Sequence, residues 1–199
     1  MKKFAKFAIV ALIMAFMLST NAKSNEPSGT GQVTDTVILT ETNDTLHEMR
    51  VNACKEYMEW VFKNQGKSFS SAKLSPEAIV SVCEEHSISI PFVMAVANLE
   101  SCFGMTSRAK RTNSVFSVGL FDNGKNMKSY ASQDESVAAF VKLIKEDYLY
   151  GEKTVEDLLK TGCFVNKYGM RYAMSQNYER NICSIMRRIV KKHPILESF

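Results

Sequence analysis

The fold is decided by residues 91–102, which read Pro-Phe-Val-Met-Ala-Val-Ala-Asn-Leu-Glu-Ser-Cys and are apolar on nearly every side. Proline suits the first position of a helix, and a glycine just beyond the last turn, here Gly104, is a common helix stop. A helix without a polar face is buried inside a domain. The segment therefore predicts a central helix, with the other elements packed around it.

Helical patterns lie on both sides of this segment. Apolar residues recur at three- and four-residue steps from Thr45 to a stop near Gly66. Ser75-Pro76-Glu77 combines an N-cap, a first-position proline and an early acid, as helix starts do. Further starts are expected at Ser132, Thr154 and Ser175.

The segment after the central helix has a different character. Residues 106–128 are polar and turn-rich, with one short apolar stretch at 115–121. The Asp122-Asn123-Gly124 triplet that follows is typical of a tight turn. We predict a small β-hairpin or irregular lobe here, so the fold class is α+β, mostly α.

The N-terminus has the order of a secretory signal peptide. A basic start precedes the unbroken apolar run 7–18, and Thr20-Asn21-Ala22 resembles a cleavage site. We predict a signal peptide at 1–22, a flexible tether at 23–44 and one domain at 45–199. The mature protein would be periplasmic or extracellular. If the signal stays uncleaved, this run alone would anchor the chain in the membrane, although it is short for a span.

Charge and cysteine content exclude several classes of protein. The chain has 199 residues and a net charge of +4, and cleavage after Ala22 removes three lysines and no acid, which leaves +1. A near-neutral chain gives no reason to expect a nucleic-acid partner. Its five cysteines contain no CxxC pair, so we expect no metal site, and export would permit disulfides among them. No cofactor motif is present.

Glu100 is the residue that does not fit its surroundings. It shares a face of the central helix with Val93 and Ala97, at the negative end of the helix dipole. Burial and the dipole both disfavour the ionised form, so we expect a raised pKa. Cleavage of a glycosidic bond needs such a group, a carboxylic acid still protonated near neutral pH. The alternative is a glutamate that only pairs with Arg108 or Arg111.

Four blocks of sequence carry a family resemblance. Residues 97–104, Ala-Asn-Leu-Glu-Ser-Cys-Phe-Gly, resemble the "AxLESGWG" signature of bacterial β-N-acetylglucosaminidases, a family that includes flagellar muramidase-like domains and autolysins. Residues 112–119, 130–136 and 171–178 are similar to the family's "TNNLFGIK", "YxSxEES" and "YATDPNYxxKI" blocks, in the same order. The resemblance covers about residues 74–190. It implies a lysozyme-like fold, with Glu100 as the catalytic acid.

The sequence departs from the family pattern in the residues around Glu100. Cys102-Phe103 replaces Gly-Trp, and Ser114 replaces an asparagine. The lobe that carries a second acid in fuller members is short here. Asp122 is the one acid available in it, and a turn-forming role suits that aspartate better.

The resemblance also suggests residues for substrate binding. It places Tyr172 near the cleaved bond, although packing at a helix start is an equal alternative. Tyr178 opens the last helix, and we interpret it as mainly structural. Asn113 and Ser114 would shape the floor of a groove. Two aromatic rings could stack on sugars or belong to the core, those of Phe103 and Phe116.

The sequence thus predicts an exported glycosidase, with no cofactor, that cuts the glycan strands of peptidoglycan. A β-N-acetylglucosaminidase is the first choice, and a lytic transglycosylase or muramidase using the same glutamate is the alternative. A third reading is an inactive module that binds glycan strands or docks on a wall-spanning secretion or conjugation apparatus. Retention of Glu100 argues against this third reading.

Overall fold

The computed structural model describes residues 33–119 and 128–197, with side chains from residue 43 onward. The chain divides into two units, Met1–Ile38 and Leu39–Phe199. The second unit contains the folded domain described here. The predicted signal peptide and the Asp122 turn lie outside the described residues.

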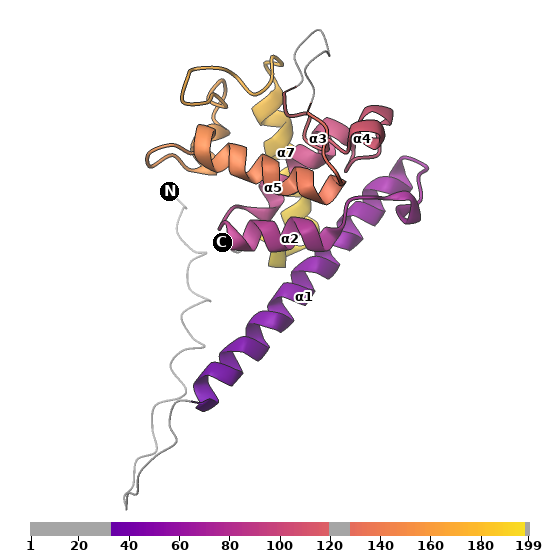
Figure 1. The fold of residues 1–199 in the computed structure, drawn as a ribbon, viewed down its shortest axis with the longest axis vertical. Helices are drawn as coiled ribbons and strands as arrows, with labels where there is room; N and C mark the ends of the chain where they lie inside the picture. The colour runs from indigo at the N-terminus through magenta and orange to yellow at the C-terminus, as the bar shows by residue number, and fades with distance from the viewer. Residues whose placement is uncertain (1–32, 120–127, 198–199) are drawn as a thin grey trace, which may run out of the picture. The chain divides into compact units, whose positions relative to one another are not determined.

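The domain is built almost entirely of helices (Figure 1). The main helices are α1 (Val33–Asn64), α2 (Pro76–Glu85), α3 (Ile90–Ser101), α4 (Ser107–Thr112), α5 (Gln133–Leu143), α6 (Val155–Leu158) and α7 (Tyr178–Lys192). Other short helical segments are the 3₁₀ helices η2 (Phe69–Ser71) and η4 (Pro194–Leu196) and the π-helix η3 (Ile144–Tyr148). The prediction of a mostly helical domain is therefore confirmed.

The predicted β-hairpin is absent from the described residues. Their β-pairing is a single antiparallel bridge between Val165 and Arg171. The segment expected to form the lobe begins instead with α4, whose N-cap Thr106 accepts a hydrogen bond from the Ala109 N–H at 3.3 Å. Its helix-favouring lysine, arginines and alanine outweigh the polar character that suggested a β lobe.

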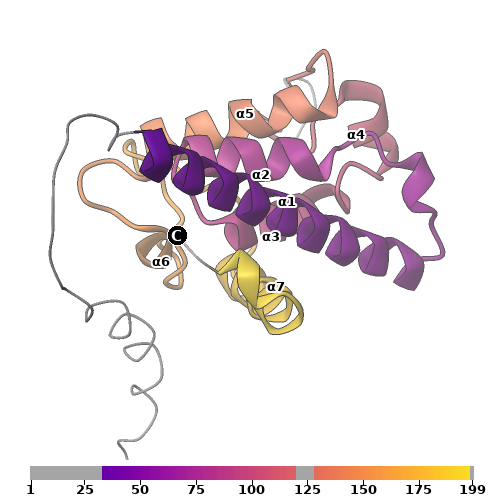
Figure 2. The ribbon, with the colours of Figure 1, turned by 90° about the horizontal axis from the view of Figure 1, so that it is seen from below.

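Helix α3 is the centre of the domain, as predicted. Its residues from Ile90 to Ala97 are all buried, and α2 and α7 pack directly against it (Figure 2). The Phe92 ring on α3 also stacks on Phe140 of α5, with ring centroids 6.2 Å apart. The Ser89 side chain caps α3, accepting a hydrogen bond from the Phe92 N–H at 3.3 Å.

Most helix starts match the sequence pattern. Ser75 caps α2, Ser132 caps α5 and Thr154 caps α6, each through a side-chain oxygen that accepts a backbone N–H. Two starts differ. α1 begins at Val33 rather than Thr45, because residues 33–44 contain no proline or glycine to stop a helix. α7 begins at Tyr178 rather than at the expected Ser175.

No helix within 33–119 and 128–197 combines the length and the apolar character that a bilayer span requires. The five cysteines are all free thiols. Cys54 and Cys83 are fully buried side chains of the core. Burial raises the pKa of both thiols well above its ordinary value, so neither is a reactive group.

An ion-pair cluster joins α1 to α2. His47 contacts Glu84 at 2.5 Å and Glu77 at 2.7 Å, and Arg50 donates to Glu84 at 2.8 Å. The hydrogen bonds to Glu84 and then Glu77 raise the pKa of His47. Burial alone would raise the pKa of Glu84, but the bonds from His47 and Arg50 outweigh it and lower that pKa.

This cluster predicts a pH-dependent stability. Protonated His47 stabilises the fold fully below its ordinary pKa of 6.5, and this contribution disappears as pH rises through the higher folded pKa. Glu84 contributes above its ordinary pKa of 4.5 and loses its contribution as pH falls through the lower folded value. We expect His47→Gln to lower the melting temperature most between the folded pKa of Glu84 and the folded pKa of His47, and least at alkaline pH. Thermal unfolding followed by circular dichroism across pH measures this.

The matched control is His86→Gln, because His86 enters no ion pair among the described residues. Its melting temperature should differ from wild type by a similar amount at each pH. A difference for His47→Gln that is the same at pH 6 and pH 9 would contradict the prediction.

Candidate active site

The end of α3 is an abrupt turn that follows Glu100 almost at once. Cys102, Phe103 and Gly104 all have left-handed backbones, with φ of 51°, 52° and 79°. The N–H groups of Cys102 and Phe103 donate to carbonyls in the last turn of α3, at 2.9 and 3.0 Å. These bonds satisfy the helix end and turn the chain toward α4.

Gly104 is fixed at this turn by close packing against α5. A Cβ atom added at Gly104 would lie 2.2 Å from Gln133 Oε1. The Gln133 amide in turn donates to the Gly104 carbonyl at 3.0 Å, and the Gly104 N–H donates to Ser101 Oγ at 2.8 Å. The helix that carries Glu100 is therefore anchored to α5.

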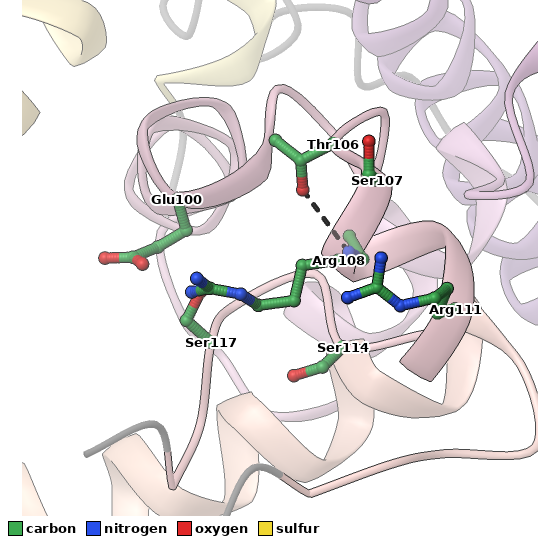
Figure 3. A pocket seen from close by; sticks show the side chains of 8 residues that line it. Glu100, Thr106, Ser107, Arg108, Arg111, Ser114 and Ser117 are labelled. Atoms are coloured by element: carbon green, nitrogen blue, oxygen red, sulfur yellow. Dashed lines mark hydrogen bonds between the residues drawn. The ribbon is translucent and has the colours of Figure 1, made fainter. Parts of the chain in front are cut away.

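A pocket of about 430 Å³ opens beside Glu100 (Figure 3). Its walls come from the end of α3, from α4 and from the segment that follows α4. The lining residues are Glu100, Thr106, Ser107, Arg108, Ala109, Arg111, Ser114 and Ser117. Glu100 is half-buried on one side, so it is neither sealed in the core nor directed into open solvent.

The surroundings of Glu100 raise its pKa, as the sequence predicted. Burial is the largest cause; hydrogen bonds from Tyr178 and Ser117 and the charge of Arg108 act in the opposite direction but do not cancel it. Among the described residues, Glu100 forms no ion pair with Arg108 or Arg111. Because a buried acid without an ion-pair partner favours its neutral form, this carboxyl can carry a proton above the usual pH range.

Tyr178, rather than Tyr172, contacts the carboxyl group. The Tyr178 hydroxyl donates to Glu100 Oε1 at 2.5 Å, and its buried ring opens α7. The Tyr172 hydroxyl instead donates to the Phe116 carbonyl at 2.6 Å. The rings of Tyr172 and Tyr178 stack with centroids 5.8 Å apart, so Tyr172 supports the tyrosine that touches the acid.

A buried ion pair holds these two tyrosines in place. Glu179, only 1% exposed, accepts from Arg171 at 2.8 Å. The same carboxylate oxygen accepts from the Phe164 N–H at 3.4 Å. Arg171 precedes Tyr172 in the chain, and Glu179 follows Tyr178. The Arg171–Glu179 ion pair therefore holds the loop before α7 against the start of α7. No local sequence pattern predicts this contact, because irregular backbone separates the two residues.

The polar residues of the second sequence block have different positions. Asn113, with φ of 55°, ends α4, and its amide donates to the carbonyls of Tyr130 and Ala131 at 2.9 and 3.1 Å. It therefore holds the backbone together outside the pocket lining. Ser114 does line the pocket, as predicted for a groove floor.

The two aromatic candidates for sugar stacking belong to the core. Phe103 and Phe116 are both 0% exposed. Phe103 packs edge-on against Tyr57 and Phe62, and Phe116 stacks on Phe140 with centroids 4.1 Å apart. The expectation that these rings stack on a sugar is corrected: no ring face is free in either case.

Strained backbone gathers around the pocket. Among the described non-glycine residues, positive φ values occur at Ser87, Cys102, Phe103, Asn113 and Ser117, and all but Ser87 lie in the segments that surround the pocket. Such conformations cost free energy and concentrate at functional sites. In the described ranges no three His, Cys, Asp or Glu side chains come close enough to hold a metal ion.

The fold and the pocket define a helical domain with one half-buried carboxylic acid on the wall of a polar pocket. Residues 76–191 match the sequence model of the Glucosaminidase family, described as mannosyl-glycoprotein endo-beta-N-acetylglucosaminidase. This match covers more than half of the chain, so the chain belongs to that family, and it is a glycoside hydrolase that acts on peptidoglycan. A comparison with curated proteins found no match.

Proposed function

We propose that the protein is exported and cleaves peptidoglycan glycan strands as a β-N-acetylglucosaminidase, with Glu100 as the general acid. The observation that carries this proposal is the state of Glu100: a half-buried carboxyl with a raised pKa on the wall of a pocket. An acid whose pKa is raised in this way keeps its proton to higher pH than an ordinary glutamate and can protonate a leaving oxygen. Among the described lining residues, Glu100 is the one carboxyl group.

A single acid favours a route in which the substrate supplies the nucleophile. Paired-carboxylate mechanisms need a second carboxylate about 5–9.5 Å away. In the single-acid route the Glu100 proton moves to the glycosidic oxygen and the C1–O bond breaks. The carbonyl oxygen of the neighbouring 2-acetamido group forms a bond to C1. Water then adds to C1, the acetamido group is released, and the Glu100 carboxylate takes up the proton of that water.

The two alternatives use the same acid at the neighbouring bond, where C1 belongs to the muramyl unit. If water attacks this C1, the product is a reducing muramic acid end and the activity is that of a muramidase. If the 6-hydroxyl of the same muramyl unit attacks its own C1 in place of water, the product is a 1,6-anhydro end and the reaction is a lytic transglycosylation. Tyr172 and Ser114 are proposed to support this site, the first through Tyr178 and the second by lining the pocket.

The test is to digest purified peptidoglycan with the mature protein and to analyse the released fragments by mass spectrometry. A reducing N-acetylglucosamine end would support the first choice. A reducing muramic acid end or an anhydro end would establish the corresponding alternative. Failure to release any fragment, by a protein that is folded by circular dichroism, would overturn the enzymatic proposal.

Export is a separate part of the proposal and rests on the sequence of residues 1–22. N-terminal sequencing of the protein recovered from a bacterial periplasm or medium would test it. We expect a mature chain beginning near Lys23. Recovery of the uncleaved chain from the cytoplasm would contradict export without affecting the assignment of Glu100.

The Tyr178–Glu100 hydrogen bond predicts a change in pH dependence. The bond stabilises the ionised carboxylate and so lowers the pKa of Glu100. Tyr178→Phe removes this donor, and the pKa of Glu100 should rise. Because the general acid acts in its protonated form, the alkaline limb of kcat/KM should move to higher pH. Initial rates of peptidoglycan cleavage across pH measure this shift.

Tyr168→Phe is the matched control, since Tyr168 is 70% exposed and lies outside the pocket lining. Its profile should overlay that of wild type. An alkaline limb that moves to lower pH in Tyr178→Phe would contradict the assigned direction of the hydrogen bond.

A further inference from the structure

Two arginines share the pocket with Glu100. Arg108 and Arg111 are three residues apart on α4, and both side chains line the same pocket (Figure 3). None of the ion pairs among residues 33–119 and 128–197 includes either guanidinium group. Exposed arginines are usually only solvated, but here two of them meet in one concave space.

Ser114 adds an unsatisfied polar group to this space. The residue is 2% exposed, and its Oγ atom has no hydrogen-bond partner within the described part of the chain. Figure 3 shows its side chain beside those of Arg108 and Arg111. A buried hydroxyl without a partner costs free energy unless a ligand or water supplies one. The pocket therefore offers a ligand two guanidinium groups and one hydroxyl that has no hydrogen-bond partner among the described residues.

The charge of the pocket depends on the state of Glu100. Among the described lining residues Glu100 is the one acid, and Arg108 and Arg111 are the two bases. When Glu100 holds the proton that acid catalysis requires, two positive charges remain without a negative one. A pocket in this state attracts an anion, and a guanidinium fork matches the two oxygens of a carboxylate.

We propose that this pocket is a subsite for a carboxylate carried by the muramyl unit next to the cleaved bond, bound by Arg108 and Arg111; the inference rests on the function proposed above. Peptidoglycan offers that chemistry from two sources. In peptide-free strands the lactyl group of muramic acid ends in a free carboxylate. In strands that keep their stems, the carboxylates belong to the peptide. A neutral polymer of N-acetylglucosamine offers neither.

The test compares binding of charged and neutralised forms of one glycan. Full-length Glu100→Gln protein, which keeps the arginines, is titrated with fluorescently labelled strands and with the same strands after their carboxylates are coupled to methylamine. Both peptide-free and stem-bearing strands are used. For at least one type of strand, we expect the form with free carboxylates to bind about tenfold more tightly than the methylamine-coupled form. This preference should weaken as salt is added.

A matched pair of variants assigns the preference to the pocket. Arg111→Gln should remove most of the preference for charged strands. Lys110→Gln removes the same charge from the neighbouring exposed position, which lies outside the pocket lining, and should keep the preference. Arg111 is chosen because Arg108 also acts on the pKa of Glu100. A preference for one type of strand identifies the source of the carboxylate.

Three results would overturn the subsite: equal affinity for charged and neutral strands, equal losses in the two variants, or no detectable binding to either form. Cleavage by the wild-type protein is assayed in parallel and decides the proposed function separately. If the wild-type protein cleaves the strands but shows no preference for carboxylates, the proposed function stands and the subsite is contradicted. If binding shows a preference that depends on Arg111 but no cleavage occurs, the subsite stands and the protein is a binding module.

Discussion

Replacing Glu100 with glutamine is expected to lower the rate of peptidoglycan cleavage by about 1,000-fold, within the range attributed to general acid catalysis. The amide keeps the size of the side chain and can still accept the Tyr178 hydrogen bond. It has no proton to transfer at neutral pH. Release of soluble fragments from labelled peptidoglycan measures the loss, and zymography gives a simple qualitative readout.

The melting temperature of Glu100→Gln should stay the same or rise, although its activity falls. The raised pKa of Glu100 means that the folded protein disfavours the ionised carboxyl above the ordinary pKa of 4.5. Glutamine carries no charge, so we expect a melting temperature at neutral pH equal to or above that of wild type. A lost activity with a retained fold separates a catalytic role from a structural one.

The control for this experiment is Glu85→Gln, an equal change at an exposed position at the end of α2. Its cleavage rate should match that of wild type. If Glu100→Gln cleaves peptidoglycan at the wild-type rate, Glu100 is not the acid. If neither wild type nor variant cleaves it, the third reading, a glycan-binding module, gains support.

Truncation of Phe140 to alanine is expected to destabilise the fold by about 3–5 kcal/mol, the range for deletion of a buried aromatic ring. The side chain is 0% exposed and touches three other rings: those of Phe92, Phe116 and Tyr172. Its loss leaves a cavity at the junction of α3, α5 and the segment beneath the pocket. Chemical denaturation measures the free energy of unfolding.

The control is Tyr168→Ala, which also removes an aromatic ring but at a position that is 70% exposed. We expect a change within about 0.5 kcal/mol, as for most surface substitutions. Similar losses for both variants would show that the ring cluster does not form the core described here.

The sequence predicted the helical framework well because local signals mark it. The apolar run at 91–102 identified the buried helix, and the caps at Ser75, Ser132 and Thr154 were all found in the expected residues. Glu100 was recognisable as the one ionisable side chain within that apolar helix. Its raised pKa follows from the same burial.

Features that depend on contacts between distant segments were not predictable in this way. The sequence suggested Tyr172 as the tyrosine near the acid, but the path of the loop before α7 brings Tyr178 to Glu100. The burial of Phe103 depends on α1, through its contacts with Tyr57 and Phe62. The helix α4 was missed because its six residues are too few for a periodic apolar pattern.

The backbone at residue 102 gives a physical meaning to the departure of this chain from its family signature. Glycine adopts a φ of 51° freely, whereas a cysteine there is strained by about 1 kcal/mol. The side chain gained in exchange is 8% exposed, and its thiol donates to Gln65 just beyond α1, at 3.1 Å. A substitution that disturbs the local backbone thus ties the turn that follows Glu100 to the segment just beyond the end of α1.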